Sequence, residues 1–351
     1  MRKPRITLSD VAAEAGVSAT TASLVLGGKT LTHRISAETH QRILEAAKAL
    51  DYVPNRLVHS MQKGSTQILS FFDGFRNRHA NDLYRDALTT AIERAAGNRG
   101  YDVLITCDFK RSPEETYRYL NGGIVDGLIF FAPQPDDPLL PYLRNSRLPT
   151  VLLGASDKEN VLSSVKDDVD SGMRLIADRL YALGHRRIAV APHVEDRNVD
   201  RDERIALLSR FMAEKGVRIQ NGPRVLSDND GETLYTHITA SPEIPTAIFC
   251  WRDFQAYCLL ESCEKRGLRV PQDLTVVGYD GLPWPMATRH KAASIKVDFE
   301  LLSETAVSLL IDSIHKPVAP PIQKKIPVTL YEGTTLASPH ADKPRASGEQ
   351  R

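Results

Sequence analysis

From residue 67 onward, short apolar segments alternate with longer amphipathic ones, and this alternation limits the possible folds more than any other feature. Amphipathic helices are expected over residues 82–98, 171–183, 204–215 and 254–266. The apolar segments expected to be strands are ILSFF, DVLIT, GLIFF, PTVLL, RRIAVA, TAIFC and LTVVG. Near-continuous apolar strands between helices are typical of parallel sheets covered on both faces. The pattern therefore predicts an α/β core of two doubly wound parallel-sheet subdomains, with a joint near residues 160–166.

The first sixty residues are organised differently, as short helices with polar caps. Thr7 begins a first helix, and Gly16 follows it with the backbone freedom that a tight helix exit needs. Ser18 is expected to cap a second helix over residues 19–26, and Ser36 a third that ends near residue 50. Two short helices joined by a glycine-containing turn are typical of a helix-turn-helix, whose second helix enters the DNA major groove.

The charge of the chain is unevenly distributed. Residues 1–64 hold nine Lys and Arg against five Asp and Glu, which leaves 36 against 39 for the remainder. A basic head on a mildly acidic body is typical of a nucleic-acid-binding module joined to a second domain. A chance fluctuation on a solvated face is the alternative interpretation of this charge difference alone.

Other classes of protein have little support in the sequence. No apolar run reaches the ~18 residues that a membrane span requires, and no apolar core follows the basic N-terminus, so neither a membrane partner nor a secretory signal is expected. No GxGxxG motif opens a βα unit, and the histidines lack metal-ligand spacing, so we expect no cofactor, no metal and no enzyme activity. The cysteines show no CxxC spacing and are expected to be free thiols in the cytoplasm: Cys107, Cys250, Cys258 and Cys263.

Two stretches of the head resemble one family closely. ITLSDVAAEAGVS and ISAETHQRILEAAKALDYVPNR together cover most of residues 6–62, and they resemble the lactose-repressor (LacI) family of bacterial transcription regulators. The resemblance continues more loosely through VDGLIFF, ALGHRRIAVA, IPTAIFC and LRVPQDLTVVGYDGLP. It implies a periplasmic-binding-protein-like core, with a ligand cleft between two subdomains that the chain crosses three times.

The resemblance also implies the order of the domains. A helix-turn-helix DNA-binding head with a hinge helix at about 55–61 occupies residues 1–62, and a linker occupies residues 63–66. The effector-binding and dimerisation core follows over residues 67–336, and residues 337–351 are expected to be a disordered tail.

The family's pattern implies a set of DNA contacts, with some departures. Leu24 stands where the family usually has an arginine, and Met61 stands where a leucine wedges into the minor groove, so these two roles stay open. Exposed methyl groups on the second helix suit thymine methyl groups better than guanine edges. The residues implied to contact DNA are Thr7, Ser18, Ala19, Thr20, Thr21, Leu24, Lys29, Arg34, Ser36, Thr39, Tyr52, Asn55, Val58 and Met61.

Polar residues follow the ends of several predicted strands, where ligands of open α/β sheets bind. The expected effector contacts are Arg76, Arg78, Asp168, Arg204, Arg252, Asp253 and Asp280; the family match implies Asp168, Arg204 and Asp280. Carboxylates accept hydrogen bonds from vicinal hydroxyls, and arginines bind carboxylate or phosphate, so the hypothesis is a polyhydroxylated anion such as a sugar acid or phosphosugar. In the alternative, these arginines face solvent or pair with the aspartates.

These observations together predict a homodimeric transcription regulator, a repressor in most of the family, associated with the bacterial nucleoid. It is expected to bind double-stranded, pseudo-palindromic operator DNA and to respond to a small polar effector, such as a sugar, sugar acid or phosphosugar. The alternatives are a cytoplasmic sugar-binding receptor and an α/β sugar enzyme, both without a role on DNA.

Overall fold

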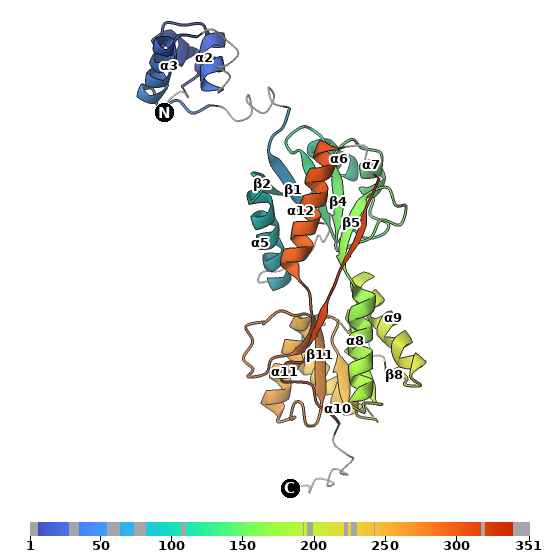
Figure 1. Ribbon diagram of the computed structural model, residues 1–351. Coiled ribbons are helices and arrows are strands. Elements are labelled where there is room, and N and C mark those ends of the chain that lie inside the picture. Colours follow the sequence, from blue (N-terminus) through green and yellow to red (C-terminus); the bar gives the residue numbers. More distant parts are fainter. Residues whose placement is uncertain are drawn as a thin grey trace. The chain divides into compact units, whose positions relative to one another are not determined.

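A computed structural model describes residues 6–27, 35–54, 64–73, 82–106, 110–191, 199–220, 230–241, 243–316 and 320–339, and the backbone of residues 193–194 and 224–225. The chain divides into two compact units, residues 1–67 and residues 68–351 (Figure 1). We call them the head and the core and describe each by itself.

The described part of the head consists of the helices α1 (Leu8–Glu14), α2 (Ala19–Leu26) and α3 (Ala37–Ala49). Small side chains let these helices pack closely, since alanines make up five of the eight fully buried members of the head's apolar cluster. Ile43 is the bulkiest member and is completely buried. Gly16 has a φ of 63°, as expected for the residue that ends the first helix. The three helices predicted here are confirmed.

The first subdomain of the core is a six-stranded sheet in the order β13-β5-β4-β3-β1-β2, and its strand pairs are parallel. Its strands are β1 (Ile68–Asp73), β2 (Asp102–Thr106), β3 (Gly127–Phe131), β4 (Thr150–Leu153), β5 (Ser163–Asp167) and β13 (Gln323–Ile326). Its helices are α5 (Leu83–Gly97), α6 (Pro113–Leu120), α7 (Leu140–Arg144) and α12 (Phe299–His315). Figure 1 shows α5 and α12 side by side, and ion pairs of Arg94 with Glu300 and Arg99 with Glu304 join them.

The second subdomain is also a six-stranded sheet, in the order β14-β12-β11-β10-β6-β8, and only β14 of its strands pairs antiparallel. Its strands are β6 (Ile188–Val190), β8 (Ile219–Gln220), β10 (Ala247–Phe249), β11 (Thr275–Asp280), β12 (Ala293–Lys296) and β14 (Thr329–Tyr331). Its helices are α8 (Val169–Ala182), α9 (Val199–Glu214), α10 (Gly231–Ala240) and α11 (Asp253–Arg266). The strands β7 (His193–Val194) and β9 (Arg224–Val225) form a separate pair.

The central strands are buried on both faces, which explains their continuous apolar sequences. Every residue of β3, β4 and β11 is buried. Because helices cover both sides of such a sheet, alternation of apolar and polar residues would place polar side chains in the core. All seven strands predicted from the sequence are confirmed as strands, each within two residues of the predicted ends.

The chain passes between the two subdomains three times, as the family resemblance implies. The crossing segments are residue 168 between β5 and α8, residues 297–298 between β12 and α12, and residues 327–328 between β13 and β14. The predicted joint near residues 160–166 is wrong, because β5 occupies residues 163–167 within the first sheet. Two predicted helices also begin earlier than expected, α8 at Val169 and α9 at Val199.

The tail that the sequence predicts to be disordered starts at residue 337, which contacts the second subdomain. The carbonyl of Ala337 accepts hydrogen bonds from His185 Nε2 at 2.8 Å and from Thr275 Oγ1 at 3.2 Å. Burial lowers the pKa of His185, which favours the neutral ring in this position. Residue 337 is thus held against the second sheet, and residues 340–351 lie outside the described part of the chain.

Candidate functional site

The head presents a helix-turn-helix whose first helix is fixed by a capping box at Thr7. The Thr7 backbone N–H donates to Asp10 Oδ2 at 2.8 Å, and the Asp10 N–H donates to Thr7 Oγ1 at 3.4 Å. The hydrogen bonds that Thr7 donates from its backbone and side chain lower the pKa of Asp10, so the carboxylate stays charged at the positive end of the helix. Thr7 therefore has a structural role in the free protein.

The second helix, α2, turns small side chains outward. Ala22 and Val25 are buried in the head's apolar cluster, whereas Thr20, on the opposite face, and Ala19, in the first turn, are exposed. Thr21 is half-buried, and its hydroxyl lies 2.8 Å from that of Ser18, the N-cap residue. A narrow surface of methyl and hydroxyl groups can approach base edges closely and can contact thymine methyl groups. Of the residues predicted on α2, Ala19 and Thr20 are the most accessible, whereas Leu24 is half-buried.

The remaining predicted DNA contacts fall into two groups. Ser36 caps α3 by accepting from the Thr39 N–H at 3.2 Å, and Tyr52 is half-buried against the head's apolar cluster. The other predicted contacts lie outside the described residues: Lys29, Arg34, Asn55, Val58 and Met61.

In the core, polar side chains from both subdomains meet at the carboxyl ends of the strands. We define the polar cluster as Asp167, Asp200, Arg204, Tyr279 and Asp280. Arg204 Nη1 lies 3.5 Å from Asp280 Oδ1 and donates to the Trp251 carbonyl at 2.6 Å. Arg204 and Asp280 were both predicted from the sequence, and the structure brings them together.

The polar cluster also holds three residues that sequence reasoning missed. Asp167 ends β5, Tyr279 comes immediately before Asp280, and Asp200 lies one turn before Arg204 on α9. The i, i+4 spacing of Asp200 and Arg204 could have suggested that they share a helix face. Nothing local in the sequence places Asp167 beside Tyr279, because 112 residues separate them.

Burial raises the pKa of two carboxyl groups of this cluster, Asp280 and Asp200. Burial raises the pKa of Asp280 to about 7 and that of Asp200 to about 6, and the Arg204 guanidinium opposes both increases. Burial also acts to lower the pKa of Arg204, but the charges of Asp280 and its neighbours outweigh it and the pKa is raised. Asp280 has a φ of 112°, a conformation that costs free energy and that clusters at ligand sites.

Arg204 retains one unused donor. The residue is 5% exposed, and among the described residues no acceptor is hydrogen-bonded to its buried Nε. A ligand oxygen is the group that such a donor lacks. The polar cluster therefore offers a hydrogen-bond donor and several carboxylate acceptors close together.

The other predicted effector residues have structural partners. Asp168 caps α8, where it accepts from Ser171 Oγ at 2.6 Å. Asp253 is 1% exposed and accepts from the Leu282 N–H and from Ser294 Oγ, both at 2.6 Å. Arg252 stacks with its guanidinium carbon 4.7 Å from the Trp251 ring centroid. Arg76 and Arg78 lie outside the described residues.

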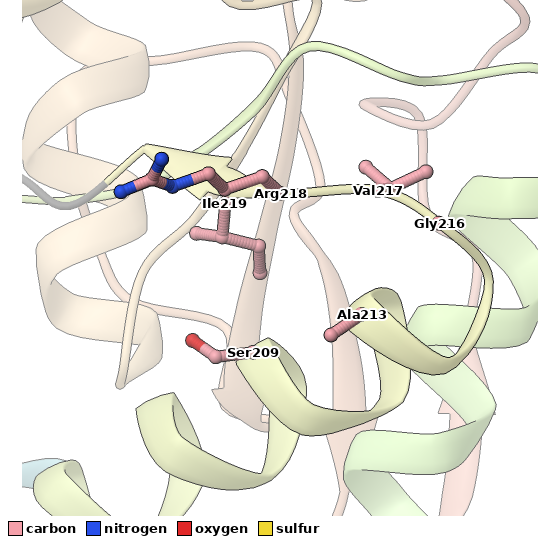
Figure 2. Close-up of a pocket in the computed structure, with 6 residues that line it drawn as sticks. All are labelled: Ser209, Ala213, Gly216, Val217, Arg218 and Ile219. Carbon is pink, nitrogen blue, oxygen red and sulfur yellow. The ribbon is translucent and has the colours of Figure 1, made fainter.

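A separate surface depression on α9 and β8 is a weaker candidate. It has a volume of about 430 Å³, and Figure 2 shows small side chains around it with Arg218 at one side. Ser209 and Arg218 are its polar side chains, and both lie toward the end of α9 and the start of β8, away from the carboxyl ends of the strands. Too few groups converge here to orient a polar ligand.

Metal and membrane sites find no support in the described part of the chain. Its His, Cys, Asp and Glu side chains form no group of three that could hold a metal ion. None of its helices is both long enough and apolar enough to cross a membrane. Cys250, Cys258 and Cys263 are buried free thiols, as predicted, and Cys107 lies outside the described residues.

Comparison with known proteins agrees with both parts of the fold. Residues 7–55 match the bacterial regulatory proteins of the lacI family, and residues 177–336 match the periplasmic binding protein-like domain. The HTH-type transcriptional repressor PurR of Escherichia coli O139:H28 is 29% identical over 339 residues, which are 94% of this chain and 97% of the repressor.

Solved structures with a similar fold include two regulators. The Lac repressor bound to ONPG in the repressed state has a TM-score of 0.78 at 26% identity, covering 95% of this chain and 100% of that one. The complex of the transcriptional regulator CelR with cellobiose has a TM-score of 0.66 at 26% identity, covering 94% of this chain and 100% of that one.

Proposed function

This chain belongs to the lacI family of bacterial regulatory proteins, and from that premise we propose that it is a homodimeric repressor whose affinity for operator DNA is set by a polyhydroxylated effector. It is a helix-turn-helix transcription regulator with a periplasmic-binding-protein-like core. The observation that carries the proposal is the joining of a groove-sized, small-residue face on α2 to a core with a convergent polar cluster. We infer that it acts in the cytoplasm, on the nucleoid, and without enzyme activity.

The DNA role is supported by the exposed face of α2. We expect the full-length protein to prefer a pseudo-palindromic duplex from its own genome, measured by electrophoretic shift. Thr20→Ala should reduce the ratio of specific to non-specific affinity by about fivefold, since a lost base contact costs on the order of 1 kcal/mol. The slope of log K against log salt should stay unchanged, because a threonine methyl group neutralises no phosphate.

This test separates recognition from simple charge attraction. A lower salt slope in Thr20→Ala, with no change in sequence preference, would mean that Thr20 contacts the DNA backbone and not a base. If the full-length protein has no preferred duplex with any candidate effector present, a sugar-binding receptor without a DNA role becomes the better interpretation.

The effector class is supported by the polar cluster. Hydroxyl groups can donate to Asp280 and Asp200 and can accept from Arg204 Nε, so a sugar satisfies both needs at once. In the described cluster three carboxyl groups surround one guanidinium, which favours a neutral sugar over the sugar acid or phosphosugar predicted from the sequence. Binding of a sugar acid or phosphosugar would depend on Arg252 and on Arg76 and Arg78. The last two lie outside the described residues. A sugar, cellobiose, occupies the structurally similar regulator CelR.

Calorimetry at pH 8 should distinguish these effectors, because Asp280 and Asp200 are mostly ionised there. We expect the best neutral sugar of a panel, with ribose and cellobiose among its members, to bind at least about tenfold more tightly than its aldonic acid, as roughly 1.4 kcal/mol of repulsion would give. Asp280→Asn should weaken binding of the neutral sugar. An aldonic acid or sugar phosphate that binds more tightly than the neutral sugar would show that the anionic hypothesis is correct.

A further inference from the structure

Tyr279 forms a direct hydrogen bond between the two subdomains. The residue lies in β11 of the second sheet and is completely buried. Its hydroxyl donates to Asp167 Oδ2 at 2.5 Å, and Asp167 is the last residue of β5 in the first sheet. Asp167 is 6% exposed, so little water competes for this bond.

The same side chain contacts the candidate effector residues. The Arg204 guanidinium carbon lies 3.7 Å from the centroid of the Tyr279 ring, and Asp280 is the next residue along β11. A cation over a buried aromatic face is attracted by the ring quadrupole. One face of Tyr279 therefore contacts Arg204, while its hydroxyl reaches the other subdomain.

The hydroxyl lies among the crossing segments. The Asp168 N–H donates to the Ile326 carbonyl at 2.9 Å, which ties the first crossing segment to the end of β13. The Val297 N–H donates to the Asp280 carbonyl at 3.2 Å, which ties the second crossing segment to β11. A Cβ atom added at Gly172 would lie 3.2 Å from both the Tyr279 hydroxyl and Val328, so α8 packs here without spare room. A change in the angle between the subdomains is therefore expected to change the contacts around the Tyr279 hydroxyl.

We propose that Tyr279 is a positioning residue that fixes the angle between the subdomains through Asp167 and links that angle to Arg204. When the Arg204 guanidinium moves toward a bound molecule, the ring loses its cation and the hydroxyl bond must readjust. The link between the subdomains rests only on contacts within this chain. The last step, from effector to Arg204, rests on the function proposed above.

Hydrogen exchange of the full-length protein, followed by mass spectrometry, tests the link without effector or operator. In Tyr279→Phe the amides of Asp168 and Val297 should exchange about tenfold faster, because a hydrogen bond to a charged group stabilises by roughly 1.5 kcal/mol or more. Asp167→Leu, which removes both carboxyl oxygens at a similar volume, should have a similar effect. The double variant should exchange about as fast as the faster single variant, since both changes remove one interaction.

The matched control is Tyr257→Phe. The Tyr257 hydroxyl is bonded to the Ala292 N–H at 3.3 Å, and both residues belong to the second subdomain, so this change should leave Asp168 and Val297 unaffected. The amide of Ile129, in the centre of the first sheet, reports global opening. The proposal is wrong if Tyr279→Phe leaves the two crossing amides unchanged, if it speeds Ile129 by the same factor, or if Tyr257→Phe speeds them equally. Because neither effector nor operator is used, a failed repressor assignment would leave this result intact.

Discussion

Replacing Ile43 with alanine abolishes specific DNA binding while the core keeps its stability. Ile43 is the bulkiest buried side chain among the described residues of the head, where the other buried ones are two valines and five alanines. Replacing a buried isoleucine with alanine costs about 2–5 kcal/mol of stability. A unit of this size has only a few kcal/mol of stability to lose, so the head should be mostly unfolded and the operator affinity should fall at least about 100-fold.

Electrophoretic titration measures the lost affinity, and calorimetric unfolding should show that the transition of the core is unchanged. Leu44→Ala is the matched control, because it removes a large apolar side chain from the next position of α3, where 40% of the residue is exposed. That variant should bind DNA nearly as the parent does. Equal losses in the two variants would mean that the surface of α3, and not the packing of the head, governs DNA binding.

Arg204→Met should be the most damaging single change in the core, and its effect should depend on pH. Methionine fills a similar volume but removes the cation that most lowers the pKa values of Asp280 and Asp200. Breaking a buried pair by removing one partner costs about 3–5 kcal/mol. We expect a loss of this size in the free energy of unfolding at pH 8, measured by chemical denaturation.

The pH dependence follows from the raised pKa values. Folded Asp280 and Asp200 titrate at about 7 and about 6, above the ordinary value of 3.8, so their contribution to stability is full at low pH and is lost as pH rises through the folded pKa values. Arg204 lowers both pKa values, so its removal raises them further and leaves larger penalties at pH 8. At pH 5 the carboxyl groups are mostly protonated and the variant should recover much of its stability.

Arg210→Met on the same helix is the control. Arg210 pairs with Asp170 at 3.0 Å, but both side chains are about half exposed, so this change should cost less than about 1 kcal/mol at either pH. If Arg204→Met lost the same stability at pH 5 as at pH 8, the loss would come from packing or from the Trp251 hydrogen bond and not from unpaired carboxylates.

The sequence predicts those elements whose signal is local. Apolar strands and polar caps are local, and Ser18, Ser36 and Asp82 are found at the N-caps of α2, α3 and α5. The start of α9 was missed because its first turn, VDRDE, carries four charged residues and no helical apolar stripe. β5 and β13 were missed because SSVKD and QKKI are largely polar sequences, and the two strands pair across 159 residues of chain, as the Ser164–Gln323 hydrogen bond shows.

The candidate site was predicted only in part, again because some of its residues have a local signal in the sequence and others do not. Arg204 and Asp280 could be identified because each lies in a recognisable phrase or at a strand end. The sequence could not tell which of the neighbouring Asp167 and Asp168 enters the polar cluster. The Asp167 side chain is bonded to Tyr279, whereas the next side chain, Asp168, caps a helix. Tyr279 was missed because a buried aromatic residue in a strand has the same pattern whether or not its hydroxyl is used.

The return of the chain to β13 also determines when the protein can be completed during synthesis. The first sheet receives β13, and its α5 face receives α12, only after strands β6 to β12 of the second subdomain have been translated. Until then, the first sheet has an unpaired edge and the second sheet lacks β14, a state in which aggregation and chaperone capture compete with folding. A nascent chain stalled near residue 297 would thus hold two incomplete subdomains, and chaperones and proteases would act on this incomplete state.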